Sequence, residues 1–415
     1  MHDVAQALDL HFNRAAPARI GVAVSGGGDS MALLQAAVVW AADQGIDVHA
    51  MTVDHGLRAS AAPEIALVAA RCAALGVPHH VRVWKDWDGQ GNLQSHARDA
   101  RYELLCACAE TLEISDVLLG HTADDQAETV MMRLARSAGV DGLAAMQPRA
   151  ARGGITLHRP FLTLGRAALR EWLEAQGVAW AEDPSNDDPG FERIRVRQAL
   201  SGLADLGLTP DALSQVAQNM TSAQTALEWQ TGRLAREILR IAHGAAVLDA
   251  ARFRALPFEL RRRLVLRVLG WLTGAFYAPR HDSLRRFLEA MSEGETATLD
   301  GCQTQGYRGE IWIFREFQAV KEMVTDAGAW WDGRWRATGC ENDGAGYTLR
   351  ALGAEGLAQV PDWRDFGAPR AALLPLPALF CADDFITTPL LPGKGGARLE
   401  LKDNAHRLFD MPVTH

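Results

Sequence analysis

A glycine-rich hexapeptide is the strongest chemical signal in the sequence. It follows the apolar run 20–24 and consists of Ser25, Gly26, Gly27, Gly28, Asp29 and Ser30. Glycines let a backbone approach a phosphate closely, and successive N–H groups form a nest for anions, so the segment predicts a phosphate-binding loop. No lysine closes it, which excludes the loop of kinases and GTPases. The carboxylate of Asp29 would repel phosphate, so we predict a Mg²⁺ ion that bridges the two. The alternative is a tight turn in which Asp29 or Ser30 caps the next helix.

Two further carboxylates, Asp125 and Glu128, are three residues apart in a predicted helix and therefore share one of its faces. Two acids that face one pocket suit the ammonium group of an amine substrate and can hold the amine for proton removal. The alternative is structural, with Asp124 capping the helix and Asp125 complementing its dipole. His121 precedes them, either for proton transfer or for packing.

Arg101 is the candidate for stabilising charge that develops at a phosphate. The alternative is a surface ion pair with Asp99 or Glu103. Asp29, Arg101, Asp125 and Glu128 together form the predicted catalytic set.

Alternating strand and helix patterns must position these residues. Apolar runs predict buried parallel strands, and the segments between them have helical periodicity, which together indicate a parallel sheet covered on both faces. Ligands of such sheets bind beyond the carboxyl ends of the strands. The predicted strands are residues 20–24, 48–53, 77–83, 116–119 and 155–157, and the predicted helices are residues 30–42, 63–75, 92–110, 124–136 and 166–176.

The pattern changes near residue 201, where helical periodicity begins to dominate. We predict an α/β catalytic domain over 1–202, a mainly helical domain over 203–318 and a small mixed or β-rich domain over 319–415. The helical part contains Arg261 and Arg262, which are candidates for contact with RNA. Trp330 and its neighbours in the last part are candidates for stacking on bases, although core packing is the more common role of such residues.

Composition narrows the class of protein further. The net charge is −9, but it is unevenly distributed: residues 1–190 carry −9, residues 191–320 carry +3 and residues 321–415 carry −3. Local clusters matter more than net charge for contact with phosphates. We find no apolar run long enough for a membrane span and no signal-peptide pattern, so a cytoplasmic location is expected. Six scattered cysteines argue against a disulfide framework.

The hexapeptide at 25–30 resembles the SGGxDS motif of PP-loop ATP pyrophosphatases. Other segments resemble one family of that class, the tRNA(Ile)-lysidine synthetases, closely to about residue 200 and moderately to about 315. These segments are Asp54-His55-Gly56-Leu57-Arg58, Ala97 to Tyr102, Gly120 to Thr129, Arg159 to Leu162, Glu182 to Asn186 and Leu256 to Arg263.

The resemblance implies a Rossmann-like PP-loop domain and a two-step reaction. ATP would adenylate the wobble cytidine in the CAU anticodon of tRNA(Ile), with release of pyrophosphate. An amine of L-lysine would then attack C2 and release AMP, which changes codon reading from AUG to AUA. Arg193, Arg195 and Arg197 would lie near the tRNA, although Ile194 stands where many members have asparagine. A homodimer is left open.

The main alternative within the same class is a tRNA 2-thiolating enzyme. Such enzymes need cysteines for sulfur transfer or a CxxC that holds an iron–sulfur cluster. Cys106 and Cys108 form only a CxC in the middle of a predicted helix.

Overall fold

The fold is described from a computed structural model of residues 1–415. The description covers residues 2–13, 16–56, 61–85, 93–182, 190, 192–275, 278–340, 346–392 and 396–410. Leu57, Arg58 and the segment 183–189, which carry parts of two family motifs, lie outside these residues. The chain divides into two compact units, residues 1–225 and residues 226–412.

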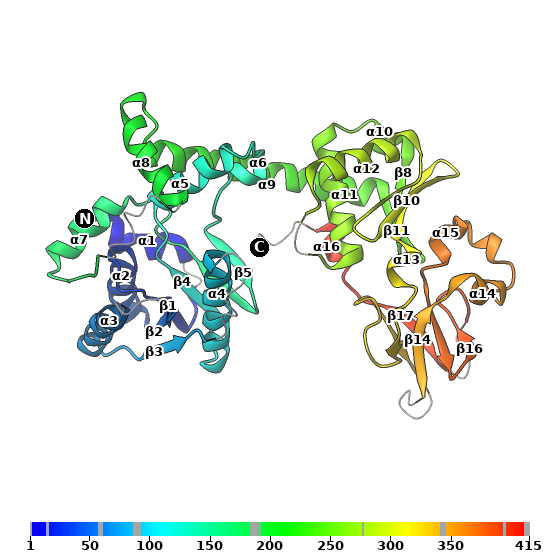
Figure 1. Cartoon of the computed structure of the whole chain (residues 1–415), viewed down its shortest axis with the longest axis horizontal. Helices are drawn as coiled ribbons and strands as arrows, with labels where there is room; N and C mark the ends of the chain where they lie inside the picture. Colours follow the sequence, from blue (N-terminus) through cyan, green and yellow to red (C-terminus); the bar gives the residue numbers. More distant parts are fainter. Residues whose placement is uncertain are drawn as a thin grey trace. The chain divides into compact units, whose positions relative to one another are not determined.

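A six-stranded sheet forms the centre of unit 1, in the order β3-β2-β1-β4-β6-β5 (Figure 1). The first five strands are mutually parallel and β5 pairs antiparallel to β6. The predicted parallel sheet is thus confirmed, and the antiparallel edge strand is an addition. The strands are β1 (Arg19–Ala23), β2 (Asp47–Asp54), β3 (His79–Val83), β4 (Asp116–Leu119), β5 (Arg149–Arg152) and β6 (Ile155–His158).

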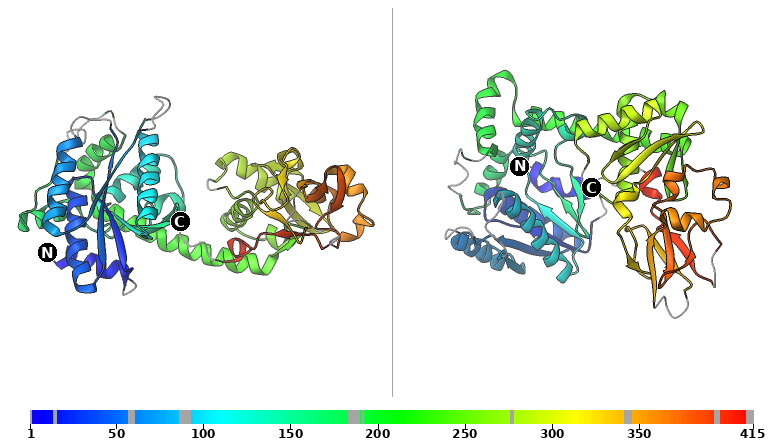
Figure 2. Two further views of the ribbon diagram at one scale, coloured as in Figure 1. Left: turned by 90° about the horizontal axis from the view of Figure 1, so that it is seen from below. Right: turned by 45° about the vertical axis from the view of Figure 1, so that its right-hand side comes forward.

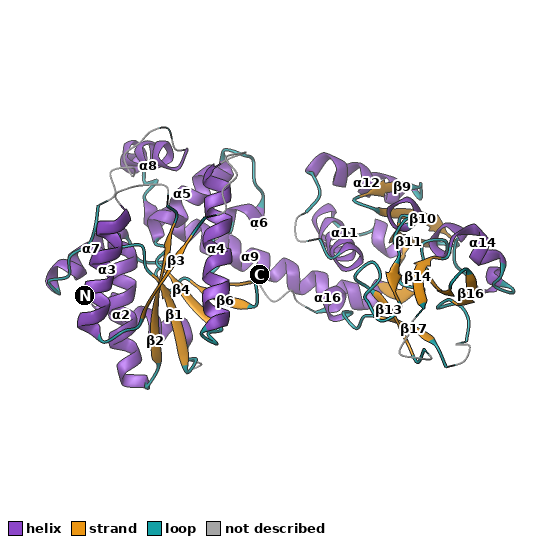
Figure 3. Cartoon of the chain, turned by 60° about the horizontal axis from the view of Figure 1, so that its bottom comes forward, coloured by secondary structure: helices purple, strands orange, loops and turns teal. Residues whose placement is uncertain are grey.

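Helices cover both faces of this sheet, as Figures 2 and 3 show. One apolar core joins β1 to helices α1, α2, α3 and α7, and a second core lies between the sheet and α4. Helices α5, α8 and the first half of α9 share a smaller core of their own. The helices are α1 (His2–Phe12), α2 (Gly28–Gln44), α3 (Ala61–Leu75), α4 (Leu93–Thr111), α5 (Ala123–Leu134), α6 (Val140–Leu143), α7 (Arg166–Ala175), α8 (Glu192–Leu203) and α9 (Pro210–Ile238).

Unit 2 is built on a five-stranded antiparallel sheet in the order β7-β8-β11-β10-β9. Helices α11, α12 and α16 share the core on one face, and most of the segment from α13 to β17 packs on the other. The elements are β7 (Leu239–Ala242), β8 (Ala245–Asp249), α10 (Ala250–Arg254), α11 (Phe258–Thr273), α12 (His281–Glu293), β9 (Ala297–Leu299), β10 (Cys302–Tyr307), β11 (Glu310–Arg315) and α13 (Phe317–Val320).

The last segment of unit 2 adds a four-stranded sheet, β12-β14-β15-β16, and a two-stranded one, β13-β17. Trp331 and Trp335 are buried in its core, whereas Trp330 lies between the cations of Arg336 and Lys402. The remaining elements are β12 (Thr325–Asp326), β13 (Trp335–Thr338), β14 (Tyr347–Ala351), α14 (Gly353–Ala358), α15 (Arg370–Leu373), β15 (Pro377–Cys381), β16 (Asp384–Thr387), β17 (Arg398–Leu401) and α16 (His406–Phe409).

The predicted domain limits at 202/203 and 318/319 stay a proposal. Residues 203–318 hold more helix than strand, but they also contain the five-stranded sheet, which the helical periodicity did not predict. No described helix is long and apolar enough to cross a membrane.

Candidate active site

The predicted phosphate loop connects β1 to α2 at the carboxyl end of the sheet. Gly26 has φ of +93°, which a glycine adopts without strain, and Gly27 is the N-cap of α2. The Ser30 hydroxyl donates to the Gly27 carbonyl at 2.9 Å and accepts from the Ser25 N–H at 3.1 Å. These bonds link the two ends of the turn. The first residues of α2 line a cavity, in which their N–H groups can meet an anion.

Helix α5 begins directly after β4, so its first turn lies at the same edge of the sheet. The N-cap is Thr122, whose hydroxyl accepts from the Asp125 N–H, while the Asp125 carboxylate accepts from the Thr122 N–H at 2.7 Å. The structural alternative, in which Asp124 caps this helix, is therefore wrong. Asp124 instead accepts a hydrogen bond from the backbone N–H of Arg166 at 2.7 Å.

Gly120 sets how closely the β4–α5 connection approaches the phosphate loop. A Cβ atom at this position would lie 3.0 Å from the Asp29 carbonyl oxygen and 3.1 Å from the Ser30 nitrogen. Both are backbone atoms, so neither can turn aside as a side chain would. The glycine is required here for space rather than for its backbone angles, because its φ is not positive.

These segments open into one cavity of about 860 Å³. It brings together the predicted loop, Arg101, His121, Asp125, Arg193 and Arg197 from the sequence-based set, and it adds Arg166 and Arg170, for which no role was predicted. Its lining residues are Ala23, Ser25, Gly27, Gly28, Asp29, Ser30, Arg101, Leu119, Gly120, His121, Asp125, Arg166, Arg170, Ala181, Glu182, Arg193 and Arg197.

Arg166, at the start of α7, joins the two halves of the site. Its guanidinium lies 3.1 Å from Asp29 Oδ2, 3.2 Å from Asp125 Oδ1 and 3.9 Å from Glu128 Oε1. Burial raises the pKa of the Asp29 carboxyl, and Arg166 opposes that rise. The second oxygen, Asp29 Oδ1, is buried and has no hydrogen-bond partner among the described residues.

Asp125 and Glu128 are paired with arginines on α8 as well. Arg193 lies 2.7 Å from Asp125 Oδ1 and also donates to Glu128 Oε2, while Arg197 lies 2.8 Å from Glu128 Oε1. Although burial acts to raise the pKa of Asp125, Arg193, His121 and Arg166 lower it below its usual value. Each of the four carboxylate oxygens thus accepts a hydrogen bond from a donor of the chain itself.

His121 and Arg101 lie deeper in the same cavity. Burial lowers the pKa of His121 to about 3, so its imidazole is neutral at physiological pH, and its Nδ1 has no described partner. Arg101 forms no hydrogen bond or ion pair among the described residues. The expected pairing with Asp99 is not found, because that carboxylate lies 3.0 Å from Arg152.

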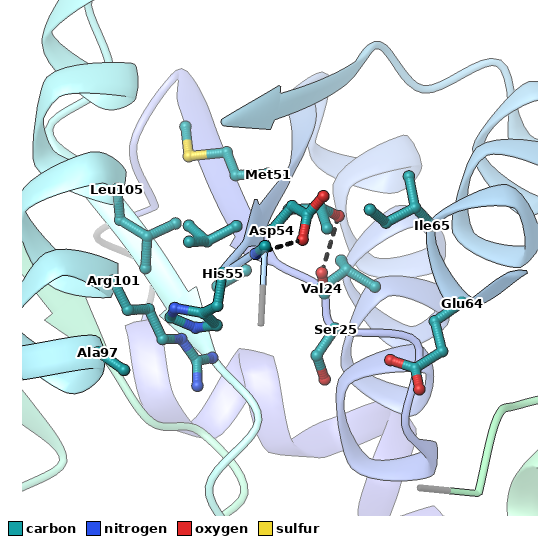
Figure 4. Close-up of a pocket in the computed structure, with 14 residues that line it drawn as sticks. Val24, Ser25, Met51, Asp54, His55, Glu64, Ile65, Ala97, Arg101 and Leu105 are labelled. Carbon is teal, nitrogen blue, oxygen red and sulfur yellow. Dashed lines mark hydrogen bonds between the residues drawn. The ribbon is translucent and has the colours of Figure 1, made fainter. Parts of the chain in front are cut away.

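A second cavity, of about 260 Å³, adjoins the first and shares Ala23, Ser25 and Arg101 with it. Figure 4 shows Arg101 and Leu105 of α4 on one side of it and Glu64 and Ile65 of α3 on the other. The end of β2 forms its floor with Met51 and Asp54, the latter accepting the Gly56 N–H at 2.9 Å. The sequence analysis assigned no role to these residues, although the position of Asp54 at the carboxyl end of β2 could have indicated one.

The remaining predicted residues lie elsewhere. Arg195 is exposed on α8 and donates to the Gly190 carbonyl at 3.1 Å. Arg261 and Arg262 belong to α11 in unit 2. Arg262 donates two hydrogen bonds of 2.7 Å to Glu259, and Arg261 donates one of 2.7 Å to Ser292.

Comparison with known proteins identifies the class and then the family. Residues 1–203 match the PP-loop domain family, a class that uses ATP. Over 414 residues the chain is 44% identical to a tRNA(Ile)-lysidine synthase of Ruegeria pomeroyi, covering 100% of this chain and 98% of that protein. A tRNA(Ile)-lysidine synthase of Zymomonas mobilis is 37% identical, and the aligned part covers 74% of this chain and 91% of that protein. The chain therefore belongs to the tRNA(Ile)-lysidine synthase family, whose members are ligases that form a carbon–nitrogen bond.

Among solved structures, a U34-tRNA thiolase from Methanococcus maripaludis is similar with a TM-score of 0.46 and 15% identity, over 54% of this chain and 78% of that one. A similarity at this level assigns no function. No cysteine is among the described residues that line either cavity. The described lining of the two cavities therefore offers no thiol for the sulfur transfer that the thiolating alternative requires.

Proposed function

We propose that this chain attaches lysine to the wobble cytidine of a tRNA(Ile) with a CAU anticodon, at the expense of ATP. The oxygen on C2 of the base would attack the α-phosphate of ATP, and pyrophosphate would leave. An amine nitrogen of lysine would then attack C2, and AMP would leave with that oxygen. The observation that carries this proposal is the single cavity that is lined by both the phosphate loop and Asp125 of α5, while Glu128 is buried outside its lining.

The first step draws on the phosphate loop and its neighbours. The N–H groups at the start of α2 would bind the phosphates, and Arg101, which has no described partner, would neutralise charge on the oxygens. The adjoining cavity, which Asp54 helps to line, has the place and size for the adenosine end of ATP. The unpartnered Oδ1 of Asp29 fits a Mg²⁺ ion, which holds few protein ligands and would neutralise the phosphates when bound.

The second step needs a lysine amine that has lost its proton. The predicted binding site for its ammonium, Asp125 with Glu128, is filled by three guanidinium groups. Lysine can therefore bind there only if at least one arginine turns away. Arg193 and Arg197 are 34% and 38% exposed, so they can move more easily than Arg166, which is 18% exposed. Neutral His121 can accept a hydrogen bond from the amine, but its low pKa makes it too weak a base to hold the ammonium proton, which would pass to water.

The test follows both steps in one assay. Purified protein is incubated with Mg²⁺, ATP, labelled lysine and an unmodified tRNA(Ile) transcript that has a CAU anticodon. We expect pyrophosphate release and label in the RNA. A transcript with a CAC anticodon serves as the matched control and should stay unlabelled. Pyrophosphate release without labelling would contradict the amine substrate, and no release would contradict the ATP chemistry.

A further inference from the structure

A second group of arginines lies around Tyr102 on α4. Arg98 places its guanidinium 5.4 Å from the Tyr102 ring centre and 3.4 Å from its hydroxyl. Arg133, at the end of α5, and Arg159, just after β6, lie close enough to Arg98 for their charges to repel. We call Arg98, Arg133 and Arg159 the Tyr102 cluster. Three elements distant in sequence thus bring three cations to one place.

The three cluster arginines lack a carboxylate partner among the described residues, whereas a fourth arginine at Tyr102, Arg152, lies 4.4 Å from the ring centre and pairs with Asp99 at 3.0 Å. Arg133 donates to the Gly142 and Ala145 carbonyls at 2.8 and 3.0 Å, and Arg159 donates to the Gln147 carbonyl at 2.7 Å. Within the described ranges, none of the three cluster arginines forms an ion pair with a carboxylate. The contacts that hold these side chains are therefore all with neutral groups.

Burial makes this lack of counter-charge costly. Arg159 is 9% exposed, and its Nε is buried with no described hydrogen-bond partner. Burial lowers the pKa of Arg133 and of Arg159, and repulsion from Arg98 lowers both further. Charged side chains in such positions are normally matched by an opposite charge. A cluster that lacks one within the chain is suited to an anion from outside.

The position of the cluster distinguishes between two phosphate sources. None of its three arginines lines either cavity. Arg101, however, lies three residues after Arg98, hence on the same face of α4, and lines both cavities. An anion at the cluster therefore lies outside the space that ATP would fill. A ligand that reaches both places must extend out of the cavity, as a polynucleotide does and a single nucleotide does not.

We propose that the Tyr102 cluster binds a backbone phosphate of the RNA whose base enters the cavity. This inference rests on the proposed function, because that function supplies the RNA. The cluster would bind without reading sequence, since a phosphodiester is the same at every nucleotide. It would orient the strand so that the neighbouring nucleotide reaches the phosphate loop.

Binding of the tRNA transcript by the full-length protein at several salt concentrations tests the proposal. Arg98 is exposed on its helix, so Arg98→Gln should fold normally. We expect affinity to fall about tenfold and the slope of log K against log salt to decrease by about one, with the KM for ATP unchanged. Arg98→Lys should recover most of the affinity, because a phosphate contact needs mainly the charge. Arg133→Gln should have a similar effect.

Arg19→Gln is the matched control. It removes one positive charge from the amino end of the strands, at the start of β1, where Arg19 pairs with Asp47. This change should leave RNA binding unchanged. An unchanged salt slope in Arg98→Gln would overturn the proposal, as would a higher KM for ATP with unchanged RNA affinity. If the unaltered protein binds RNA but transfers no lysine, the proposed function fails and the inference can still be decided by binding. If it binds no RNA, both fail.

Discussion

The arginines Arg98 and Arg101 on α4 of unit 1 and those of α11 in unit 2 differ in what neutralises them. On α11, Arg263 is 3% exposed and lies between Glu228 and Glu259, and Arg262 pairs with Glu259. In unit 1, Arg98 and Arg101 have no carboxylate partner among the described residues. Yet residues 1–190 carry a net charge of −9 and residues 191–320 carry +3. Net charge thus does not locate the cations that lack a carboxylate partner, because what a ligand meets is the charge left after internal pairing.

The largest effect should come from the carboxylate in the phosphate loop. We expect Asp29→Ala to reduce pyrophosphate release by about 10²–10³-fold or more, because developing charge at the phosphates would lose its organising group. RNA affinity should stay near normal, as measured on the same preparation. Asp43→Ala, an exposed position near the other end of α2, is the control. Unchanged pyrophosphate release in Asp29→Ala would refute the metal role.

The paired arginines of α11 should act on stability instead. Arg263→Ala removes the shared partner of Glu228 and Glu259, but Arg267 and Arg262 still neutralise them, so we expect a loss of about 1–3 kcal/mol in the free energy of unfolding of unit 2. Arg262→Ala should cost less than about 1 kcal/mol, because this pair is more exposed. Urea unfolding followed by tryptophan fluorescence measures both. Equal stability of the Arg263 variant and the unaltered protein would contradict a stabilising role for the paired arginines of α11.

Arg166 belongs to unit 1 but is paired, so it tests whether pairing or location decides the role. In Arg166→Gln, burial and mutual repulsion would raise the pKa of Asp29 and Asp125, since the guanidinium that opposes both is gone. Ionisation then needs a higher pH. We expect the acid limb of kcat/KM to move upward by about one pH unit. Arg170→Gln, which lines the cavity but pairs with Glu182, should leave the limb in place. No shift in Arg166→Gln would assign it to folding alone.

The smallest effect is expected from Arg261→Ala combined with Arg262→Ala. The sequence-based hypothesis is that these residues contact the RNA. Their hydrogen bonds to Ser292 and Glu259 leave fewer N–H groups for a phosphate. We expect RNA affinity to fall about threefold, with a slightly smaller salt slope. Equal loss of ATP binding would indicate misfolding. A loss greater than that of Arg98→Gln would reverse the comparison between the units.

The sequence predicted the sheet of unit 1 well because each parallel strand is a short apolar run between helices. It predicted the cavity for a related reason, since motif residues follow strands β1, β2 and β4 and therefore meet at one edge. Of the five-stranded sheet of unit 2, only residues 311–314 were read as β-like. The rest was missed because strands such as β10 (Cys302–Tyr307) mix polar with apolar residues and stand among helices. Antiparallel strands of this length leave a weak signal in a single sequence.

Partner choice was the other limit of prediction. Spacing showed that Asp125 and Glu128 share a helix face, but it could not show that Arg166 lies against both, 41 and 38 positions later in the chain. Nor could it show that Asp99 pairs with Arg152 and leaves Arg101 free for the cavity. Such pairings depend on how β6 and α7 return to the sheet. They follow from tertiary structure, which local pattern does not contain.

Gly120 makes the tolerance of this site unusually small. In the proposed reaction the phosphate loop and the first turn of α5 would serve different chemical steps. At Gly120 the neighbouring atoms are backbone atoms of Asp29 and Ser30 rather than adaptable side chains. A single methyl group at position 120 would act as a spacer, moving the adenylate and the incoming amine apart by a few tenths of an ångström. Reaction rates depend steeply on such distances. The distance between the phosphate loop and the β4–α5 connection thus depends on the absence of a Cβ atom at position 120.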